Sequence, residues 1–574
     1  MPEEEGQIYL HPDIRGRFMM GNDIDMVKVV FSDGNERLVP KGISLKELGE
    51  SVAKEYKYTI VAAKVNNDIK ELNLQLFSDC KVEFIDLSDE DGMRIYRRSL
   101  HFILIKAVHE LFPDRKVIIG HSISKGVYCE IRGETDLREE EVKAIEDRMR
   151  KLVEAKVPFI KRVMTLEDAR DIFMKRGRMD RYHAIEYRSK PYVTIYDCGG
   201  LEDYFYGYMV PHTGYARLFS LKYYYPGLIM LYPDKSDPEV IPEFAEQRKL
   251  FNVFVEYKRW GHILGVDNVG ALNDIIKAGN ICDFMRVSEA LQEKKIAQIA
   301  DMISNSQNKK RIVLISGPSS SGKTTFANRL AIQLRVNGLR PVTISLDDYF
   351  VSREQTPKDE KGDYDFEALE AIDIQLFNHH LAELICGNQV EIPVFNFPNG
   401  CREDVGRKLC IDDDQLLVIE GIHGLNEKLT ATIARDSKFK IYVSALTSMN
   451  IDDHNRIPST DTRIIRRMVR DFQFRGSSAV NTIKRWPSVR RGEEKNIFPF
   501  QEEADIMFNS SLIFELGVLK TFAEPLLAEV DASHPGYSEA KRLLEFLSYL
   551  LPIDSREIPF NSIIREFIGG SCFY

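Results

Sequence analysis

The segment GPSSSGKTT combines two glycines with three serines, a lysine and two threonines. Glycine permits backbone angles that a side chain hinders, so successive N–H groups can turn inward around a phosphate at the start of a helix. The lysine supplies a mobile cation for the outer phosphates, and the first threonine hydroxyl can ligate Mg²⁺. We therefore predict a loop that binds a nucleotide through Gly317, Pro318, Ser319, Ser320, Ser321, Gly322, Lys323, Thr324 and Thr325.

The loop needs a strand before it and a helix after it. Ile312 to Ile315 is a short β-branched run, and Phe326 to Leu334 has the spacing of an amphipathic helix. Strand, loop and helix therefore follow in the order that a phosphate-binding loop requires.

A second group of chemically useful residues follows the run PVTISLDDYF at 341–350. A strand that ends beside the phosphate-binding strand would place its acids at the carboxyl edge of a parallel sheet, where ligands bind. Asp347 is predicted to accept a proton from an alcohol attacking the γ-phosphate, and to help hold Mg²⁺. Asp348 is the alternative base, and a carboxylate that only caps a helix is the structural alternative.

Another carboxylate ends the buried run QLLVIEGIHGL at 415–425. Glu420 is placed there as a magnesium contact at the end of a strand. His423 has no evident chemical partner in the sequence, so we interpret it as structural.

Four arginines recur at helical spacing in DTRIIRRMVRDFQFRG, residues 461–476. Such a helical face can close as a lid over phosphates, where guanidinium groups stabilise spreading charge. A solvated face paired with Asp461 and Asp471 is the alternative. Because a phosphate-binding loop precedes it, we predict phosphate contact for the arginines of this face, namely Arg463, Arg466, Arg467 and Arg470.

Taken together, GPSSSGKTT, SLDDYF, YDFEALEAID, PVFNFPNGCR, VIEGIHG and DTRIIRRMVRDFQFRG resemble the uridine kinase and phosphoribulokinase family in order and spacing. The resemblance covers about residues 305–515. It implies a P-loop kinase domain with a doubly wound parallel sheet, which uses ATP and Mg²⁺ to phosphorylate the ribose 5′-hydroxyl of a uridine- or cytidine-like nucleoside in a cytoplasmic enzyme.

The resemblance also implies roles for single residues. Asp347 matches the catalytic aspartate, which acts with Lys323, while Thr324 and Glu420 match the magnesium contacts. Substrate contacts are implied for Phe366, Glu367, Phe395, Arg402, Arg463 and Asn481, and Arg466, Arg467 and Arg470 belong to the lid over ATP. The family's base-reading tyrosine and histidine correspond here to Phe395 and Gly400, which leaves the identity of the base open.

Residues 26–87 predict a small α+β domain, with strands at Ile60 to Val65 and Lys81 to Ile85 and a helical stretch from Ser44 to Tyr56. FSDGNERLVPKGISLKELGE and VAAKVNNDIKELNLQL resemble the TGS domain, a ubiquitin-like fold. This resemblance implies contact with RNA or a small ligand, or a regulatory role, and an inert packing module is the alternative.

Residues 88–242 resemble the α+β editing domain of threonyl-tRNA synthetase, through RRSLHFILIKAVHELFP and DYFYGYMVPHTGYARLFSL. The histidine and cysteine positions of that family's editing site fall at Arg98, Phe102, Phe205 and Met209. His101 and His212 lie near these positions, but one residue along a helix rotates a side chain by about 100°. We interpret the domain as a scaffold or binding module that has lost the editing chemistry.

The composition and the remaining segments limit the classes of function that the chain can have. A net charge of −10 over 574 residues argues against sequence-independent nucleic-acid binding by the whole chain. Eight scattered cysteines suggest reduced thiols, and neither a secretion signal nor a membrane span is evident. Residues 243–304 are predicted to be a helical connector and 516–574 a C-terminal helical extension. An RNA-associated nucleotide-binding regulator and a kinase of a sugar phosphate or another metabolite stay open as alternative functions, and the oligomeric state is not predicted.

Overall fold

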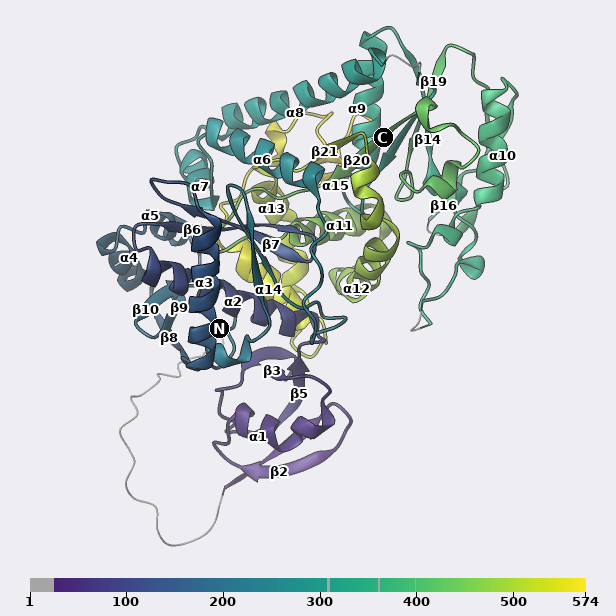
Figure 1. Ribbon diagram of the computed structural model, residues 1–574. Coiled ribbons are helices and arrows are strands. Elements are labelled where there is room, and N and C mark those ends of the chain that lie inside the picture. The colour runs from purple at the N-terminus through teal and green to yellow at the C-terminus, as the bar shows by residue number, and fades with distance from the viewer. Residues whose placement is uncertain (1–24, 307–309, 360–361, 398, 574) are drawn as a thin grey trace, which may run out of the picture.

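The computed structural model describes residues 25–306, 310–359, 362–397 and 399–573. The N-terminal α+β domain forms one end of the molecule and the parallel sheet of the C-terminal region forms the other (Figure 1). Residues 1–18, which we expected not to form a secretion signal, lie outside the described residues. Within the described part, no helix is both long enough and apolar enough to cross a bilayer.

The first domain is a mixed sheet with strand order β2-β1-β5-β3-β4 and one helix on it. The predicted strands and helix are confirmed, although α1 ends at Val52, before the expected Tyr56. Its start is fixed by Ser44, whose hydroxyl accepts from the backbone N–H of Glu47 while the Glu47 side chain accepts from the N–H of Ser44. The elements are β1 (Met26–Phe31), β2 (Glu36–Pro40), α1 (Leu45–Val52), β3 (Ile60–Val65), β4 (Asp68–Glu71) and β5 (Cys80–Asp86).

The second domain packs helices against two antiparallel sheets, with strand orders β10-β9-β8 and β11-β12-β7-β6. Its long helix α2 buries an apolar stripe that includes Leu100, Phe102 and Ile103. The elements are α2 (Glu90–Leu111), β6 (Lys116–Ile123), β7 (Gly126–Arg132), α3 (Glu139–Glu154), β8 (Phe159–Thr165), α4 (Leu166–Lys175), α5 (Met179–Glu186), β9 (Tyr192–Cys198), β10 (Leu201–Tyr204), β11 (Ser220–Tyr224) and β12 (Gly227–Leu231).

The predicted helical connector contains α6 (Arg248–Ile263), α7 (Val269–Lys277) and α8 (Ile281–Ser304). Helix α8 lies along α9 (Lys323–Val336), where buried Arg329 pairs with Glu293 at 2.6 Å. The connector therefore packs on the helix that follows the phosphate-binding loop.

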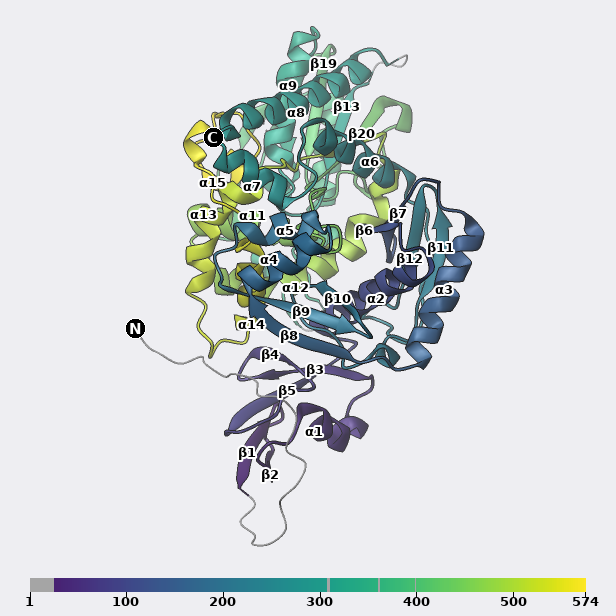
Figure 2. The same cartoon turned by 90° about the vertical axis from the view of Figure 1, so that its left-hand side faces the viewer.

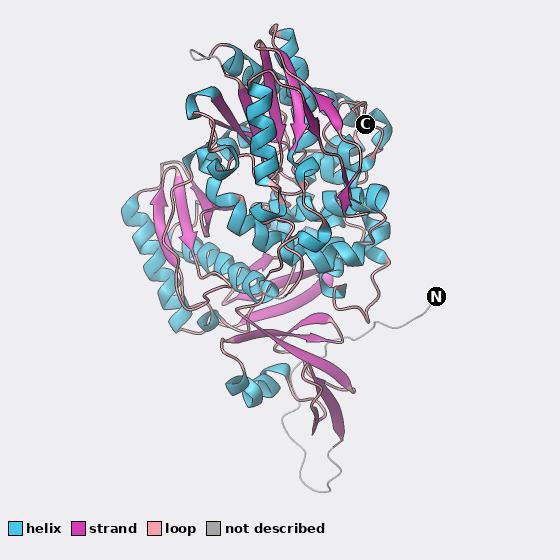
Figure 3. Cartoon of the chain, turned by 90° about the vertical axis from the view of Figure 1, so that its right-hand side faces the viewer, coloured by secondary structure: helices cyan, strands magenta, loops and turns pink. Residues whose placement is uncertain are grey.

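The C-terminal region is built on a parallel sheet with strand order β14-β19-β13-β20-β21 (Figure 3). Alternate residues of the central strand face different helices: Val313 and Ile315 pack in the cluster that contains α9, whereas Ile312 and Leu314 pack in the cluster that contains α10. Both faces are covered, as predicted for a doubly wound sheet. The elements are β13 (Ile312–Ser316), β14 (Arg340–Ser345), α10 (Ile374–Ile385), β19 (Gln415–Glu420), β20 (Lys438–Ser444), α11 (Ser459–Arg475), α12 (Ala479–Asn496) and β21 (Ile506–Asn509), with the short ladders β15 (Val390–Ile392), β16 (Phe395–Asn396), β17 (Cys401–Arg402) and β18 (Arg407–Leu409).

The position of β14 differs from our expectation. We expected the strand before Asp347 to lie directly beside the phosphate-binding strand, but β19 lies between them. The apolar run of β19 is buried on both faces, as a central position requires, whereas β14 is partly exposed and lies at the edge of the sheet.

The C-terminal extension contains α13 (Glu515–Ala528), the predicted α14 (Tyr537–Leu547) and the short α15 (Arg565–Ile568). Helix α14 lies next to β4 (Figure 2). Its Lys541 pairs with Asp68 of the first domain at 2.8 Å, and its Arg542 pairs with Asp461 of α11 at 2.6 Å. The extension therefore joins the first domain to helix α11 of the C-terminal region.

The second domain also contacts the C-terminal region through a buried polar cluster. Asp203 pairs with Arg181 at 2.7 Å, and its other oxygen lies 2.6 Å from the His454 ring. All three side chains are almost fully buried, so this contact fixes the two regions against each other.

Candidate functional site

The phosphate-binding loop lies between β13 and α9, at the carboxyl edge of the parallel sheet. Gly322 has φ +81°, and Ser320 has φ +59°. Among the described residues, the buried hydroxyls of Ser320 and Ser321 have no hydrogen-bond partner. A loop with turned backbone and unsatisfied hydroxyls has the donors that an anionic ligand needs.

The two glycines of the loop are required for different structural reasons. Gly322 has a left-handed backbone, as we expected. Gly317 has no such angle, but a Cβ there would lie 1.8 Å from the Val443 carbonyl oxygen. The first glycine is therefore required by the close approach of β20, rather than by its backbone conformation.

Lys323 begins α9 and lies among acids. Its ammonium group donates to the Pro318 carbonyl at 3.2 Å. Burial lowers its pKa, while Glu420 and Asp347 oppose that shift. The structure thus brings together the lysine and two of the predicted catalytic or metal-binding carboxylates from separate strands.

The residues predicted to hold Mg²⁺ form an oxygen-rich cluster. The Glu420 carboxylate accepts from the Thr324 hydroxyl at 3.2 Å and from the Ser345 hydroxyl at 2.9 Å. Burial, and then the charge of Asp347, raise the pKa of Glu420 to about 7. Hydroxyl and carboxylate oxygens are suitable magnesium ligands, and a divalent cation would offset the mutual repulsion of the acids, so the residues fit the ion. Ser345 was not predicted.

Asp347 and Asp348 lie in the turn Leu346–Tyr349 that follows β14. The Ser345 hydroxyl accepts from the Asp347 N–H at 3.3 Å. Asp347 acts electrostatically on both Lys323 and Glu420, whereas the pKa of Asp348 is raised by burial and lowered by a backbone hydrogen bond from Phe395. Asp347 therefore lies near enough to Lys323 and Glu420 to act on their charges, and Asp348 lies near the segment around Phe395.

The arginine face of α11 divides into two pairs. Arg463 pairs with Glu493 and donates to the Ser319 carbonyl at 3.0 Å, and Arg466 pairs with Glu515 behind the loop. Both are buried. Arg467 donates to the Ser319 hydroxyl at 2.8 Å, and Arg470 pairs with Asp471 at 2.8 Å. Arg463 and Arg466 are thus bound to protein groups, and they help to position the loop. Direct phosphate contact by Arg466 stays a prediction.

Glu367 and Phe366 lie close to the arginine face. Glu367 is buried against α12, where a Cβ on Gly492 would lie 2.3 Å from the Glu367 Cβ. Burial raises its pKa to about 7, and Arg467 opposes that shift. Phe366 is 38% exposed, and Asn481 is exposed at the start of α12. An exposed ring beside a buried acid suits an acceptor with an apolar and a hydroxyl-bearing part.

The segment around Phe395 packs against the turn that carries Asp347 and Asp348. Phe395 packs near Phe350, with ring centroids 5.7 Å apart. Arg402 donates to the carbonyls of Tyr349 and Phe350 at 2.8 and 3.0 Å, and pairs with Asp373. Its guanidinium is thus used to hold the turn that carries Asp347, and substrate contact by Arg402 stays a prediction.

The second domain brings together the positions that we aligned with an editing site. Phe102 and Phe205 pack with ring centroids 5.0 Å apart, and both are buried together with Met209. Arg98 donates to the Tyr208 carbonyl at 2.8 Å. His101 is not part of this ring cluster, and His212 accepts from the Gly214 N–H at the start of a short turn. The side chains at the four aligned positions, Arg98, Phe102, Phe205 and Met209, offer no general acid or base at neutral pH.

Residues 312–513 match the model of the phosphoribulokinase / uridine kinase family. The match confirms the resemblance of the C-terminal region to that family, and we call residues 312–513 the kinase domain. The N-terminal part is similar to threonine–tRNA ligases: 31% identity to that of Desulforamulus reducens and 28% to that of Halorhodospira halophila, over 34% of this chain and 31% of each relative. The chain therefore spans about a third of the length of the curated relatives it matches.

Two solved structures are similar to part of the chain. A possible uridine kinase from Bacillus stearothermophilus is 20% identical, with a TM-score of 0.27 over 38% of this chain and 98% of that chain. The D-glycerate 3-kinase from Cryptococcus neoformans is 13% identical, with a TM-score of 0.26 over 37% of this chain and 89% of that chain.

Two acids at the loop of the kinase domain were missed by sequence reasoning. Glu493 accepts from the Ser319 N–H at 3.1 Å. Glu566, in α15 of the C-terminal extension, accepts from the N–H and the hydroxyl of Thr325 at 3.2 and 2.9 Å. No motif marks either acid, because each reaches the loop from a distant helix. Glu566 thus occupies donors at the start of α9 that could bind a phosphate.

Proposed function

We propose that the kinase domain transfers the γ-phosphoryl group of ATP to the 5′-hydroxyl of a nucleoside-like acceptor. The observation that supports this proposal best is the position of Lys323 at the start of α9, Asp347 directly after β14 and Glu420 at the end of β19, all at the carboxyl edge of the sheet. A cation for phosphate, an acid for the acceptor alcohol and an acid for a metal are the groups that phosphoryl transfer needs.

In the proposed mechanism, the loop N–H groups and Lys323 hold the phosphates of ATP at the start of α9. Thr324, Glu420 and Asp347 would hold Mg²⁺, which when bound neutralises charge on the phosphate oxygens. Asp347 orients the acceptor hydroxyl and takes its proton during in-line attack on the γ-phosphorus. Arg467 and Arg470 are less deeply buried than Arg463 and Arg466, with side chains 14% exposed, and from there they would stabilise transferring charge and exclude water.

The acceptor side is proposed from Glu367, Phe366 and Asn481, because Arg463 is buried and held by Glu493 and the Ser319 carbonyl. Glu367 would accept hydrogen bonds from ribose hydroxyls, and Phe366 would pack on the nucleoside. Because Phe395 and Gly400 offer no side-chain polar group to a base, we propose weak discrimination among bases. A sugar phosphate or another metabolite is the alternative acceptor.

The direct test is ADP release from the full chain, with ATP and Mg²⁺, across a panel of nucleosides and sugar phosphates. We expect turnover with one or more nucleosides and product phosphorylated at the 5′-oxygen by NMR. Turnover with sugar phosphates alone would show that the acceptor is a sugar phosphate and not a nucleoside. No turnover with any acceptor would refute the kinase proposal.

Acceptor binding should depend on pH through Glu367. Its pKa is raised to about 7, so the carboxylate is ionised above that value and protonated below it. We expect the KM for the acceptor to rise about tenfold between about pH 8 and about pH 6. Glu367→Gln should give a high KM at every pH. A wild-type KM that is flat over this range would contradict the role.

ATP must displace Glu566 from Thr325. We expect Glu566→Gln to tighten ATP binding about tenfold in calorimetry, because a charge-assisted hydrogen bond and a repulsive carboxylate are removed from the phosphate position. Glu557→Gln, at an exposed acid in the same extension, is the matched control and should leave the affinity unchanged. Equal affinities for all three proteins would show that Glu566 does not compete with ATP.

A second candidate is an RNA-associated regulator whose first two domains respond to nucleotide. The similarity of the N-terminal part to threonine–tRNA ligases, and the apolar cluster at Phe102 and Phe205, favour binding over editing. Binding of tRNA across a salt series, with and without ATP, tests it. Tight tRNA binding without turnover of any acceptor would favour this candidate.

A further inference from the structure

A cavity of about 320 Å³ lies where the first domain, the second domain and α14 meet. Its lining includes Asp68, Arg98, Tyr196, Tyr204, Lys541 and Tyr549. We call it the interdomain cavity. Its volume lies within the range of small-molecule sites, and none of the proposed kinase residues line it.

Arg98 differs from the other cations of the interdomain cavity. Lys541 pairs with Asp68 at 2.8 Å and Lys190 pairs with Glu545 at 2.6 Å. The remaining cations also have carboxylate partners, namely Arg94 with Asp91, Lys161 with Glu71, Arg188 with Glu545 and Arg542 with Asp461. Among the described residues, no carboxylate pairs with Arg98, which donates only to the Tyr208 carbonyl.

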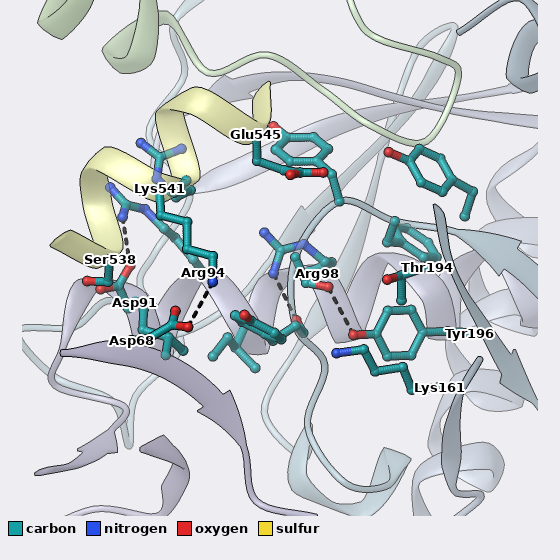
Figure 4. A pocket seen from close by; sticks show the side chains of 18 of the residues that line it. Asp68, Asp91, Arg94, Arg98, Lys161, Thr194, Tyr196, Ser538, Lys541 and Glu545 are labelled. Atoms are coloured by element: carbon teal, nitrogen blue, oxygen red, sulfur yellow. Dashed lines mark hydrogen bonds and ion pairs between the residues drawn. The ribbon is translucent and has the colours of Figure 1, made fainter. Parts of the chain in front are cut away.

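The charge of Arg98 is therefore not neutralised. Burial lowers the pKa of Arg98, Tyr206 and Tyr196 oppose that shift, and the charges of Arg542 and Arg94 lower the pKa further. Figure 4 shows Arg98 between Tyr196 and the α14 residues Lys541 and Glu545. A half-buried guanidinium without a counter-ion favours an anion that enters the cavity.

A second polar group in the cavity also lacks a partner. Tyr204 is 1% exposed, and its hydroxyl forms no hydrogen bond with any residue that the structure describes. A buried hydroxyl without a partner is costly, and a ligand that reaches it would remove that cost.

The walls of the interdomain cavity are aromatic. Phe205, Tyr206, Tyr208 and Tyr549 line it together with Tyr196 and Tyr204. Arg188 lies over the Tyr549 ring at 4.8 Å. Aromatic rings give a large apolar contact area with polar tips, which suits a flat ring better than a flexible polar chain.

We propose that the interdomain cavity binds a small planar anion: an aromatic or heteroaromatic ring that carries one carboxylate or phosphate group. The anionic group pairs with Arg98, the ring lies among the tyrosines, and a polar atom of the ligand reaches the Tyr204 hydroxyl. The site needs the first two domains and α14 together, so neither a separate kinase domain nor a separate N-terminal half contains it.

Calorimetric titration of the full chain with phenyl phosphate and with benzoate tests the proposal and distinguishes the two anionic groups. We expect binding of one or both probes, weakened about ten- to a hundredfold in Arg98→Met, which removes the charge and keeps the aliphatic stem. Arg97→Met is the matched control, because Arg97 is a neighbouring arginine of α2 that pairs with Glu90 and does not line the cavity.

Two further variants keep the proposal falsifiable. Tyr204→Phe removes only the hydroxyl and should weaken probe binding about threefold or more. If Arg98→Met does not fold, the affinity of Tyr204→Phe for the probes tests the proposal instead. Probe binding should persist in Lys323→Ala, which excludes the phosphate-binding loop as the site. Binding of neither probe at millimolar concentration, equal binding by wild type and Arg98→Met, or loss of binding in Lys323→Ala would each overturn the proposal.

Discussion

Asp347→Asn should lower kcat about 10²- to 10⁴-fold while leaving the Kd for ATP within about threefold. The amide keeps the size of the side chain but cannot take the proton of the acceptor hydroxyl. ATP binding depends mainly on the loop N–H groups and Lys323, so it should change little. Steady-state ADP release and ATP calorimetry on the same preparation separate the two effects.

Asp348→Asn is the matched control for this substitution. Asp348 is adjacent in the chain, but its pKa responds to the Phe395 backbone, whereas Asp347 acts electrostatically on Lys323. We expect its kcat to stay within about tenfold of wild type. If Asp348→Asn lowers kcat strongly and Asp347→Asn does not, the general base is Asp348.

Lys323→Ala should weaken ATP binding about a hundredfold, because charged hydrogen bonds to two phosphates are lost. The substitution also removes the cation that offsets Glu420 and Asp347, so the remaining acids repel the incoming phosphates. Calorimetry with ATP and Mg²⁺ gives the affinity, and product formation should fall in parallel.

Lys428→Ala controls for loss of a positive charge in the same domain, since Lys428 is exposed and distant from the loop in sequence. It should bind ATP as wild type does. A thermal melt of Lys323→Ala shows whether the fold persists. A folded Lys323→Ala protein that keeps wild-type affinity for ATP would remove the basis for assigning this loop to nucleotide binding.

Local sequence predicted the core of the kinase domain because its signals lie within a few residues of one another. The run before Gly317, the fixed spacing of Lys323 and Thr324, and the helix after them specify a strand, a loop and a helix without reference to the rest of the chain. The predicted helical stretch from Ser44 likewise begins where expected, and the structure shows that Ser44 and Glu47 cap its start.

The strand order and the contacts of the arginines could not be predicted from the sequence. The position of β19 between β13 and β14 depends on which of the strands is buried on both faces. Motifs identify single strands but do not compare the burial of one strand with that of another. Helical spacing placed the four arginines on one face, but only packing showed that Arg466 meets Glu515 and that Arg467 reaches Ser319. Periodicity gives the face of a helix, not what lies opposite it.

The sequence by itself determined the phosphate-binding loop, the carboxylates that end the strands and the family of the kinase domain, because residues near one another in the chain carry these features. Only the tertiary structure decided that Glu566 lies on Thr325 and that Arg98 faces a cavity closed by α14. Glu566 and Thr325 are 241 residues apart, and burial and charge pairing between such distant segments are fixed only when the whole chain packs.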